Sequence, residues 1–212
     1  VSLAVNLAFA RTLHATTDME STVIMALILV LIVPLGLAEH AVFIGAASAV
    51  ATASKYIVTV DKQHVFNPAA LALVALGLLF PQFAASWWVG TTSMLPAVIV
   101  FGTLVARKTR RIGVVLTFLG VYGAVITAPE IADGQSFAAI WEVWKLDVVQ
   151  TSLLFFVLFM VTDPITIPWG RLAKPAYVSL VALLYASQGL LFMPFALLPE
   201  QALCVGNAVS FL

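Results

Sequence analysis

Long apolar runs follow one another along almost the whole chain, and they constrain the fold more than any other feature. Each run is close to the roughly 20 residues that a helix needs to cross a bilayer. Polar residues or Pro and Gly separate them, at about 22–38, 42–60, 67–80, 91–106, 112–129, 148–162, 173–193 and 200–212. Only 9% of the 212 residues are charged, against roughly 25% in an average soluble domain. The sequence therefore predicts an all-α, polytopic membrane helical bundle of about eight transmembrane segments, forming one domain over residues 1–212.

Basic residues are unevenly divided between the two sides of this predicted bundle. When successive loops are assigned to alternate sides, only Lys145 falls on one side. The other side receives Arg11, Lys62, Arg107, Lys108, Arg110, Arg111, Arg171 and Lys174. Because Lys and Arg accumulate in cytoplasmic loops, we expect both termini in the cytoplasm and the chain in a bacterial-type inner membrane. The longest outer loop is then 130–147, in which Trp141 and Trp144 are expected interface anchors.

Several kinds of site are excluded by the residues themselves. No Ser, His and acid fall together as hydrolysis requires, and no Gly-rich phosphate loop is present. The three histidines fall at different ends of the predicted spans, or before them, so no two can ligate one buried haem. Cys204 is the only cysteine and supplies neither a disulfide nor a CxxC metal pair. We therefore predict no metal site and no nucleic-acid partner.

Two polar breaks interrupt the apolar runs, at Asn67-Pro68 in KQHVFNPAA and at Thr162-Asp163-Pro164 in FMVTDPITIP. A helix cap explains each, since Asn and Asp accept from free first-turn amides and Pro needs no donor there. A helix start at membrane depth also presents free amides to an anionic or carbonyl-rich ligand. A carboxylate at mid-bilayer costs roughly 2.5–3.5 kcal/mol on insertion scales. We expect a fresh helix after each break and a capped, paired or hydrated Asp163.

The two breaks indicate a duplicated unit, with halves at about 17–106 and 112–212. Eight full spans would make the halves parallel repeats, whereas an inverted pair requires a re-entrant segment such as 67–80. Gly90-Thr-Thr-Ser93 offers hydroxyls at the outer side, where Thr91 or Thr92 is expected to cap a helix. The candidate cofactor-binding residues are Lys62 and His64 at the cytoplasmic mouth, Asn67, Thr162 and Asp163 as the shell, and Thr91, Thr92 and Ser93 at the outer mouth.

These strings resemble the RnfD/NqrB family, the membrane flavin-carrying subunits of the Rnf complex and of the sodium-pumping NADH:quinone oxidoreductase. The matching pieces are KQHVFNPAALALV and FMVTDPITIP. Further strings are similar to a shorter branch, in which this membrane domain precedes a cytosolic ferredoxin-reductase-like FAD/NAD(P) domain: TDMESTVIMALILVLIV, ASWWVGTTSMLP and PEQALCVGNAVSFL. The resemblance covers nearly all of the chain.

The resemblance implies a membrane electron-transfer domain, a component of an NAD(P)H-linked oxidoreductase. It implies a non-covalent flavin, FMN or riboflavin, or a quinone, and as a partner a cytosolic reductase domain or subunit beyond Leu212. The apolar composition makes the lipid bilayer a second partner, and a homo-oligomer is a further expectation. Covalent FMN is not expected, because DGQSFAAIW keeps Asp133 and Ser136 of the flavinylation motif but lacks its Gly and Thr. The family fold is similar to that of urea transporters, so a channel or transporter for a small solute or ion is the alternative. A bare membrane anchor is a third interpretation.

Overall fold

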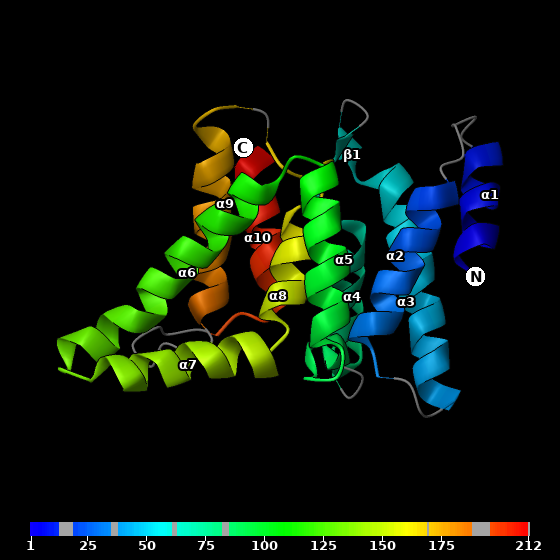
Figure 1. Ribbon diagram of the computed structural model, residues 1–212. Coiled ribbons are helices and arrows are strands. Elements are labelled where there is room, and N and C mark those ends of the chain that lie inside the picture. Colours follow the sequence, from blue (N-terminus) through cyan, green and yellow to red (C-terminus); the bar gives the residue numbers. More distant parts are fainter. Residues whose placement is uncertain are drawn as a thin grey trace. The chain divides into compact units, whose positions relative to one another are not determined.

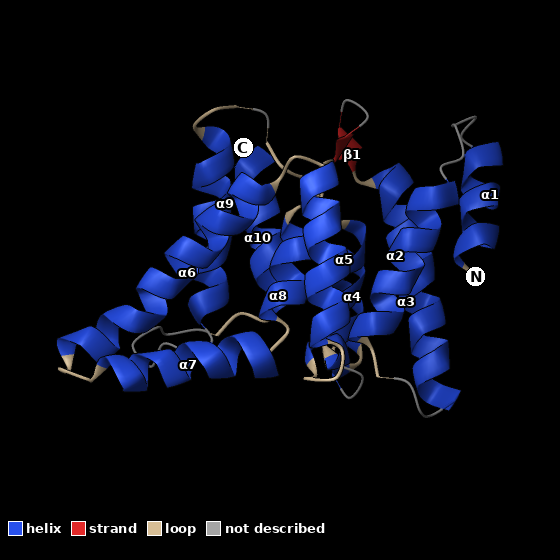
Figure 2. Cartoon of the chain, in the orientation of Figure 1, coloured by secondary structure: helices blue, strands red, loops and turns tan. Residues whose placement is uncertain are grey.

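A computed structural model describes residues 1–12, 19–34, 38–60, 63–81, 85–168, 170–187 and 196–211. The described chain is helical apart from one two-stranded hairpin, which confirms the all-α prediction (Figures 1 and 2). Contacts divide it into two compact units, Val1–Trp88 and Val89–Leu212. Lys62, one of the candidate cofactor-binding residues, lies outside the described residues. The predicted duplication divides the chain elsewhere, between residues 106 and 112, and stays a prediction.

The first unit is built around one long helix. Its helices are α1 (Ser2–Thr12), α2 (Met19–Ile32), α3 (Ala38–Ile57) and α4 (Pro68–Leu79). Helix α3 packs against the other three. Strands β1 (Thr59–Val60) and β2 (Gln63–His64) connect α3 to α4 as an antiparallel hairpin, with Thr59 opposite His64. The hairpin connects the end of α3 to the start of α4.

The tryptophan pair closes the end of α2. The last carbonyls of a helix have no partner within it. Here the backbone amides of Ser86 and Trp87 donate to the Ile32 carbonyl at 3.1 and 2.9 Å, and the indole N–H of Trp88 donates to the Val30 carbonyl at 2.8 Å. Residues 85–88 therefore serve as a C-cap for α2.

The second unit contains the remaining helices. The 3-10 turn η2 (Trp88–Gly90) begins at the last residue of the first unit. The helices that follow are α5 (Leu95–Lys108), α6 (Ile112–Ala132), α7 (Phe137–Gln150), α8 (Leu153–Phe155), the π-helix η3 (Phe156–Val161), α9 (Ala173–Ala186) and α10 (Pro199–Phe211). Helix α9 lies between α6 and α10, and η3 packs against α5 and α6. Aromatic rings fill the centre, where Tyr185 stacks on Phe156 with centroids 4.8 Å apart and meets Phe118 edge-on at 5.8 Å.

Each predicted apolar span contains a described helix, but several boundaries were wrong. The predicted outer loop 130–147 holds most of α7, whose start is capped by Ser136 accepting from the Ala139 amide at 3.3 Å. The span 42–60 ends in strand β1 rather than in helix. Helix α5 begins at Leu95 instead of 91. After Asp163-Pro164 the chain makes turns, and α9 begins only at Ala173.

Helix length gives limited support to the predicted number of spans. Within the described residues, only α6 is both long and apolar enough to cross a bilayer, and α7 with α8 and η3 would form a second span only as one pair bent by 69°. Helices α2, α4 and α9 are apolar but have 12 to 14 residues, or about 20 Å, against a hydrocarbon core of about 30 Å. Prolines explain why two of these helices are short, since α2 ends two residues before Pro34 and α4 ends two residues before Pro81.

Candidate functional site

The break at Thr162-Asp163-Pro164 is held by hydrogen bonds within the turn. The Thr162 hydroxyl donates to the Leu158 carbonyl at 2.6 Å, which turns this buried side chain back onto η3. Asp163 is half-buried, and its two carboxylate oxygens accept from the Ile165 amide at 3.1 Å and from the Thr166 hydroxyl at 3.4 Å. The carboxylate therefore caps a turn, as the sequence predicts, although no helix starts there.

Tyr177 and Asn207 extend this turn into the protein interior. The Tyr177 hydroxyl donates to Asn207 Oδ1 at 2.6 Å, and the two residues are 4% and 0% exposed. Thr166 and Asp163 both lie close enough to the Tyr177 hydroxyl to act on it electrostatically. Asp163, Thr166, Tyr177 and Asn207 are called the Asp163 cluster below. They place a carboxylate, two hydroxyls and an amide at the ends of η3, α9 and α10.

One atom of the Asp163 cluster has no hydrogen bond. Asn207 Nδ2 is buried and finds no partner among the described residues. A buried polar group without a partner costs roughly 1–3 kcal/mol. An amide N–H can donate to a carbonyl oxygen or to another acceptor. Asn207 Nδ2 is therefore a buried donor that the acceptor of a ligand could satisfy.

The break at Asn67-Pro68 is a complete helix cap in the first unit. Asn67 is buried, with backbone angles outside the helical region, and its Oδ1 accepts from the amides of Ala69 and Ala70 at 3.1 and 3.2 Å. Pro68 occupies the first helical position, where no donor is needed. His64 lies on strand β2, one short turn before this cap. The capping interpretation of Asn67 is confirmed.

The Thr91–Ser93 segment does not cap a helix, so that prediction was wrong. The N-cap of α5 is Met94, with no side-chain bond, and the Met94 amide donates to the Thr91 carbonyl at 3.0 Å. Thr91, Thr92 and Ser93 are exposed, and the Thr91 and Ser93 hydroxyls lie 3.1 Å apart. Gly90 precedes this turn and lies so close to the backbone of Ser152 that an added Cβ would sit 2.6 Å from its amide nitrogen. Backbone packing fixes the segment there.

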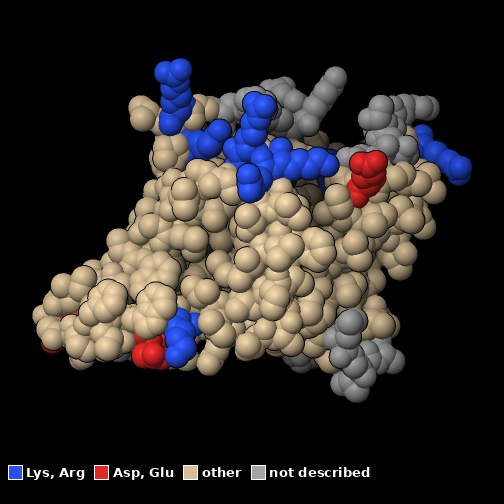
Figure 3. Space-filling model, viewed as in Figure 1, with Lys and Arg blue, Asp and Glu red and all other residues tan. Residues whose placement is uncertain are grey.

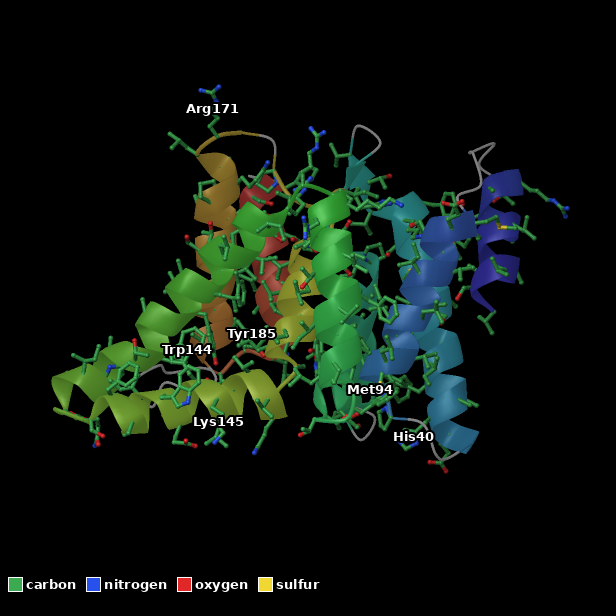
Figure 4. All side chains as sticks on the ribbon, in the orientation of Figure 1. His40, Met94, Trp144, Lys145, Arg171 and Tyr185 are labelled. Atoms are coloured by element: carbon green, nitrogen blue, oxygen red, sulfur yellow. The ribbon has the colours of Figure 1, made fainter. Side chains whose placement is uncertain are left out.

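The second unit separates two of the predicted groups of site residues. Arg111 follows the C-terminal end of α5 and donates from Nη2 to the carbonyl of Pro164, the residue after Asp163, at 3.5 Å. Asp163 therefore lies near that end of α5. Thr91–Ser93 precede the N-terminal end of the same 14-residue helix. That length is about 20 Å, so these groups cannot touch one ligand of ordinary size. Figure 4 shows Met94 and Arg171 at opposite ends of this unit.

Sequence reasoning missed a second polar group in this unit, made by α6, α7 and α9. The Tyr122 hydroxyl donates to Asp147 Oδ2 at 2.8 Å, and the Tyr122 ring meets Tyr185 and Trp144 edge-on with centroids 5.6 and 6.3 Å apart (Figure 4). The available signal was the presence of polar residues inside apolar runs, namely Tyr122, Tyr177 and Asn207. Their partners lie 25 and 30 residues away in the sequence, which local pattern cannot reveal.

Comparison with known proteins adds no family to these observations. No protein-family model matches the chain. No curated protein matches it significantly either. The resemblance to the RnfD/NqrB family therefore rests on the residues of the two motifs and the similar strings around them.

Proposed function

We propose that the chain is a membrane electron-transfer domain of the RnfD/NqrB type, with about eight membrane segments, several of them short or broken. The observation that carries the proposal is that both motifs of the resemblance coincide with helix interruptions. Asn67 begins α4, and Thr162 ends η3. Interrupted helices with polar groups at their ends are where membrane transporters bind substrates and ions, and we propose the same position for a redox cofactor.

Exposed apolar surface supports the membrane placement. Phe101, Leu116 and Leu172 are 62, 64 and 84% exposed. Only 33% of the apolar window of α6 is buried, whereas the core helix of a soluble protein is mostly buried. Soluble monomers rarely expose extended apolar patches. We therefore propose that these exposed apolar side chains contact the acyl chains of lipids.

The Asp163 cluster is the proposed binding position for the cofactor. A flavin or quinone carries ring carbonyl oxygens, and Asn207 Nδ2 is a buried donor that lacks an acceptor among the described residues. The Tyr177 hydroxyl donates to Oδ1 of the same amide, and Thr166 lies near that hydroxyl. When bound, the cofactor supplies the redox chemistry, and these residues bind and orient it. Electrons would come from a cytosolic FAD/NAD(P) reductase and leave to a membrane or outer-side acceptor.

The test is binding of riboflavin, FMN and a short-chain quinone to the purified chain in detergent. Flavin fluorescence quenching and the visible spectrum report binding, and NAD(P)H with a ferredoxin-reductase-type enzyme reports reduction. We expect Asn207→Leu to lower affinity about tenfold or more, because it removes the buried donor. Glu39→Gln is the control, since Glu39 is an exposed acid in the first turn of α3. If wild type binds none of the three compounds, the electron-transfer proposal is wrong.

Transport of a small polar solute or ion is the second candidate, and the same buried cluster favours it. A carboxylate, hydroxyls and an amide at a broken helix are also the groups that line transport pathways. Flux into proteoliposomes that is lost in Asp163→Asn, without bound chromophore, would favour transport. Flux equal to that of empty liposomes would exclude it.

A further inference from the structure

Basic side chains gather at one end of the second unit. They come from the end of α5, the turn to α6, and the start of α9: Arg107, Lys108, Arg110, Arg111, Arg171 and Lys174. These residues are called the basic end below. Figure 3 shows Lys and Arg gathered there, and Figure 4 shows Arg171 and Lys145 at opposite ends of the unit. Lys145 is paired with Glu142 at 3.1 Å, so the opposite end carries little net positive charge from it.

Arg110 occupies a backbone position that favours glycine. Its φ is +57°, and it follows the last turn of α5. The Arg111 amide donates to the Ala106 carbonyl at 2.7 Å and the Arg110 amide to the Arg107 carbonyl at 3.1 Å, which is the Schellman pattern of a helix C-terminus. Glycine fits this left-handed position without steric cost, whereas other residues are strained there. An arginine at this position adds positive charge at the expense of backbone strain.

Arg111 links the turn to the loop after η3 and keeps one donor group unused. Its Nη2 donates to the Pro164 carbonyl, while Nη1 is buried and has no hydrogen-bond partner within the described part of the chain. A guanidinium matches the oxygens of a phosphate with parallel N–H bonds. Arg111 thus lies among exposed cations and carries one buried N–H group that has no acceptor within the described residues.

An exposed apolar face leads directly to these cations. Val100, Leu104 and Lys108 are spaced four residues apart, so they follow one face of α5. Val100 and Leu104 are 55 and 58% exposed, and Lys108 is exposed. Phe101, 62% exposed, widens the apolar face. The surface changes from apolar to cationic along the helix, as the boundary between acyl chains and head groups requires.

We propose that the basic end binds the phosphate head group of an anionic phospholipid, with an acyl chain lying along Val100, Phe101 and Leu104. Basic clusters next to a membrane helix attract anionic lipids. The membrane that covers the adjoining apolar face supplies phosphate head groups at this boundary, which favours a lipid over an acidic protein partner. The proposal depends on membrane placement and is independent of electron transfer.

The experiment compares phosphatidylglycerol with phosphatidylcholine as the probe. The full chain is titrated with each lipid in mixed micelles, and bound lipid is counted by native mass spectrometry. Arg107→Gln with Lys108→Gln removes two charges and keeps good helix formers. We expect roughly 25-fold weaker phosphatidylglycerol binding, because each of the two basic residues near an anionic surface contributes roughly fivefold. Lys145→Gln is the matched control and should bind as wild type does.

Several outcomes decide against the proposal. Equal binding of the two lipids by wild type, or equal weakening by Lys145→Gln, would overturn it. Inorganic phosphate that displaces the lipid at millimolar concentration would assign the site to free phosphate. Unchanged lipid preference in the double variant, together with lost reduction by a soluble reductase, would assign the surface to a protein partner. Arg171→Gln with Lys174→Gln provides a second variant if the first is unstable, with weaker lipid binding expected again.

Discussion

The Tyr177 hydroxyl donates to Asn207 Oδ1 at 2.6 Å, joining α9 to α10 across thirty residues of sequence. This bond makes the buried amide of Asn207 tolerable, because it satisfies one of the two polar atoms. It also orients the amide so that Nδ2 points away from Tyr177. The stability of this helix pair and the direction of the unused donor thus depend on one phenol.

Tyr177→Phe tests that bond. The variant removes the hydroxyl and leaves Asn207 Oδ1 without its donor, so we expect the free energy of unfolding to fall by about 1–3 kcal/mol. Thermal unfolding in detergent, followed by tryptophan fluorescence, measures the change. Thr91→Ala is the control, because Thr91 is exposed, and it should leave the midpoint within error. An unchanged midpoint in Tyr177→Phe would mean that the bond contributes nothing net.

Gly90→Ala is expected to destabilise the second unit. An alanine Cβ at this position would lie 2.6 Å from the Ser152 amide nitrogen and 2.7 Å from the Thr151 carbonyl carbon, and backbone atoms cannot move aside cheaply. We expect a loss of about 1–3 kcal/mol. Gly120→Ala is the matched control, because nothing lies within 4 Å of its added Cβ. In the middle of α6 that substitution should raise stability by roughly 0.5–1 kcal/mol. Equal effects of the two would refute the close approach.

Asn67 variants separate capping from ligand binding. Asn67→Ala should lower stability by about 0.5–2 kcal/mol, because two first-turn amides of α4 lose their acceptor. Asn67→Asp keeps the acceptor and adds a negative charge at a helix N-terminus, but its buried carboxylate pays a desolvation cost, so it should lose less stability than Asn67→Ala rather than exceed wild type. The ligand affinity of Asn67→Asp, compared with that of wild type, then shows whether the ligand contacts the side-chain amide of Asn67. Wild-type affinity there would leave Asn67 with a capping role alone.

Much of the helical pattern could be predicted from the sequence, because apolar runs bounded by Pro and Gly are local signals. The cap at Asn67 was also predictable, since the acceptor and its amides lie within three residues. Helix α7 was missed because the acids and tryptophans of 137–150 are typical of an interfacial loop. The role of Trp88 was missed for a different reason: its partner, the Val30 carbonyl, lies 58 residues away.

The candidate site could be predicted only in part. Asp163 stood out because a carboxylate follows a long apolar run, and the turn around it is local. Tyr177 and Asn207 come together only when α9 packs on α10, so no spacing rule identifies the pair. Thr91–Ser93, expected at the outer mouth, precede α5 about one helix length from Asp163, and only their capping role was wrong.

Arg110→Gly and Arg107→Gly should have opposite effects on stability, although each removes one arginine. At φ +57° glycine relieves strain, so Arg110→Gly should raise the free energy of unfolding by about 1 kcal/mol. Arg107 lies inside the last turn of α5, where glycine costs about 1 kcal/mol. Thermal midpoints measured side by side in one detergent give the sign. Two shifts in the same direction would contradict the left-handed cap at Arg110.

The π-helical turn η3 spans Phe156–Val161, immediately before Thr162 and Asp163. A π-helix takes one more residue per hydrogen-bonded loop than an α-helix, so it amounts to a single inserted amino acid. Removing one residue from this turn would restore α-helical geometry and rotate the residues after the turn by about 100° around the helix axis. The direction of the Asp163 carboxylate therefore depends on the one extra residue in η3. A one-residue deletion there would rotate the carboxylate and remove no residue of the Asp163 cluster.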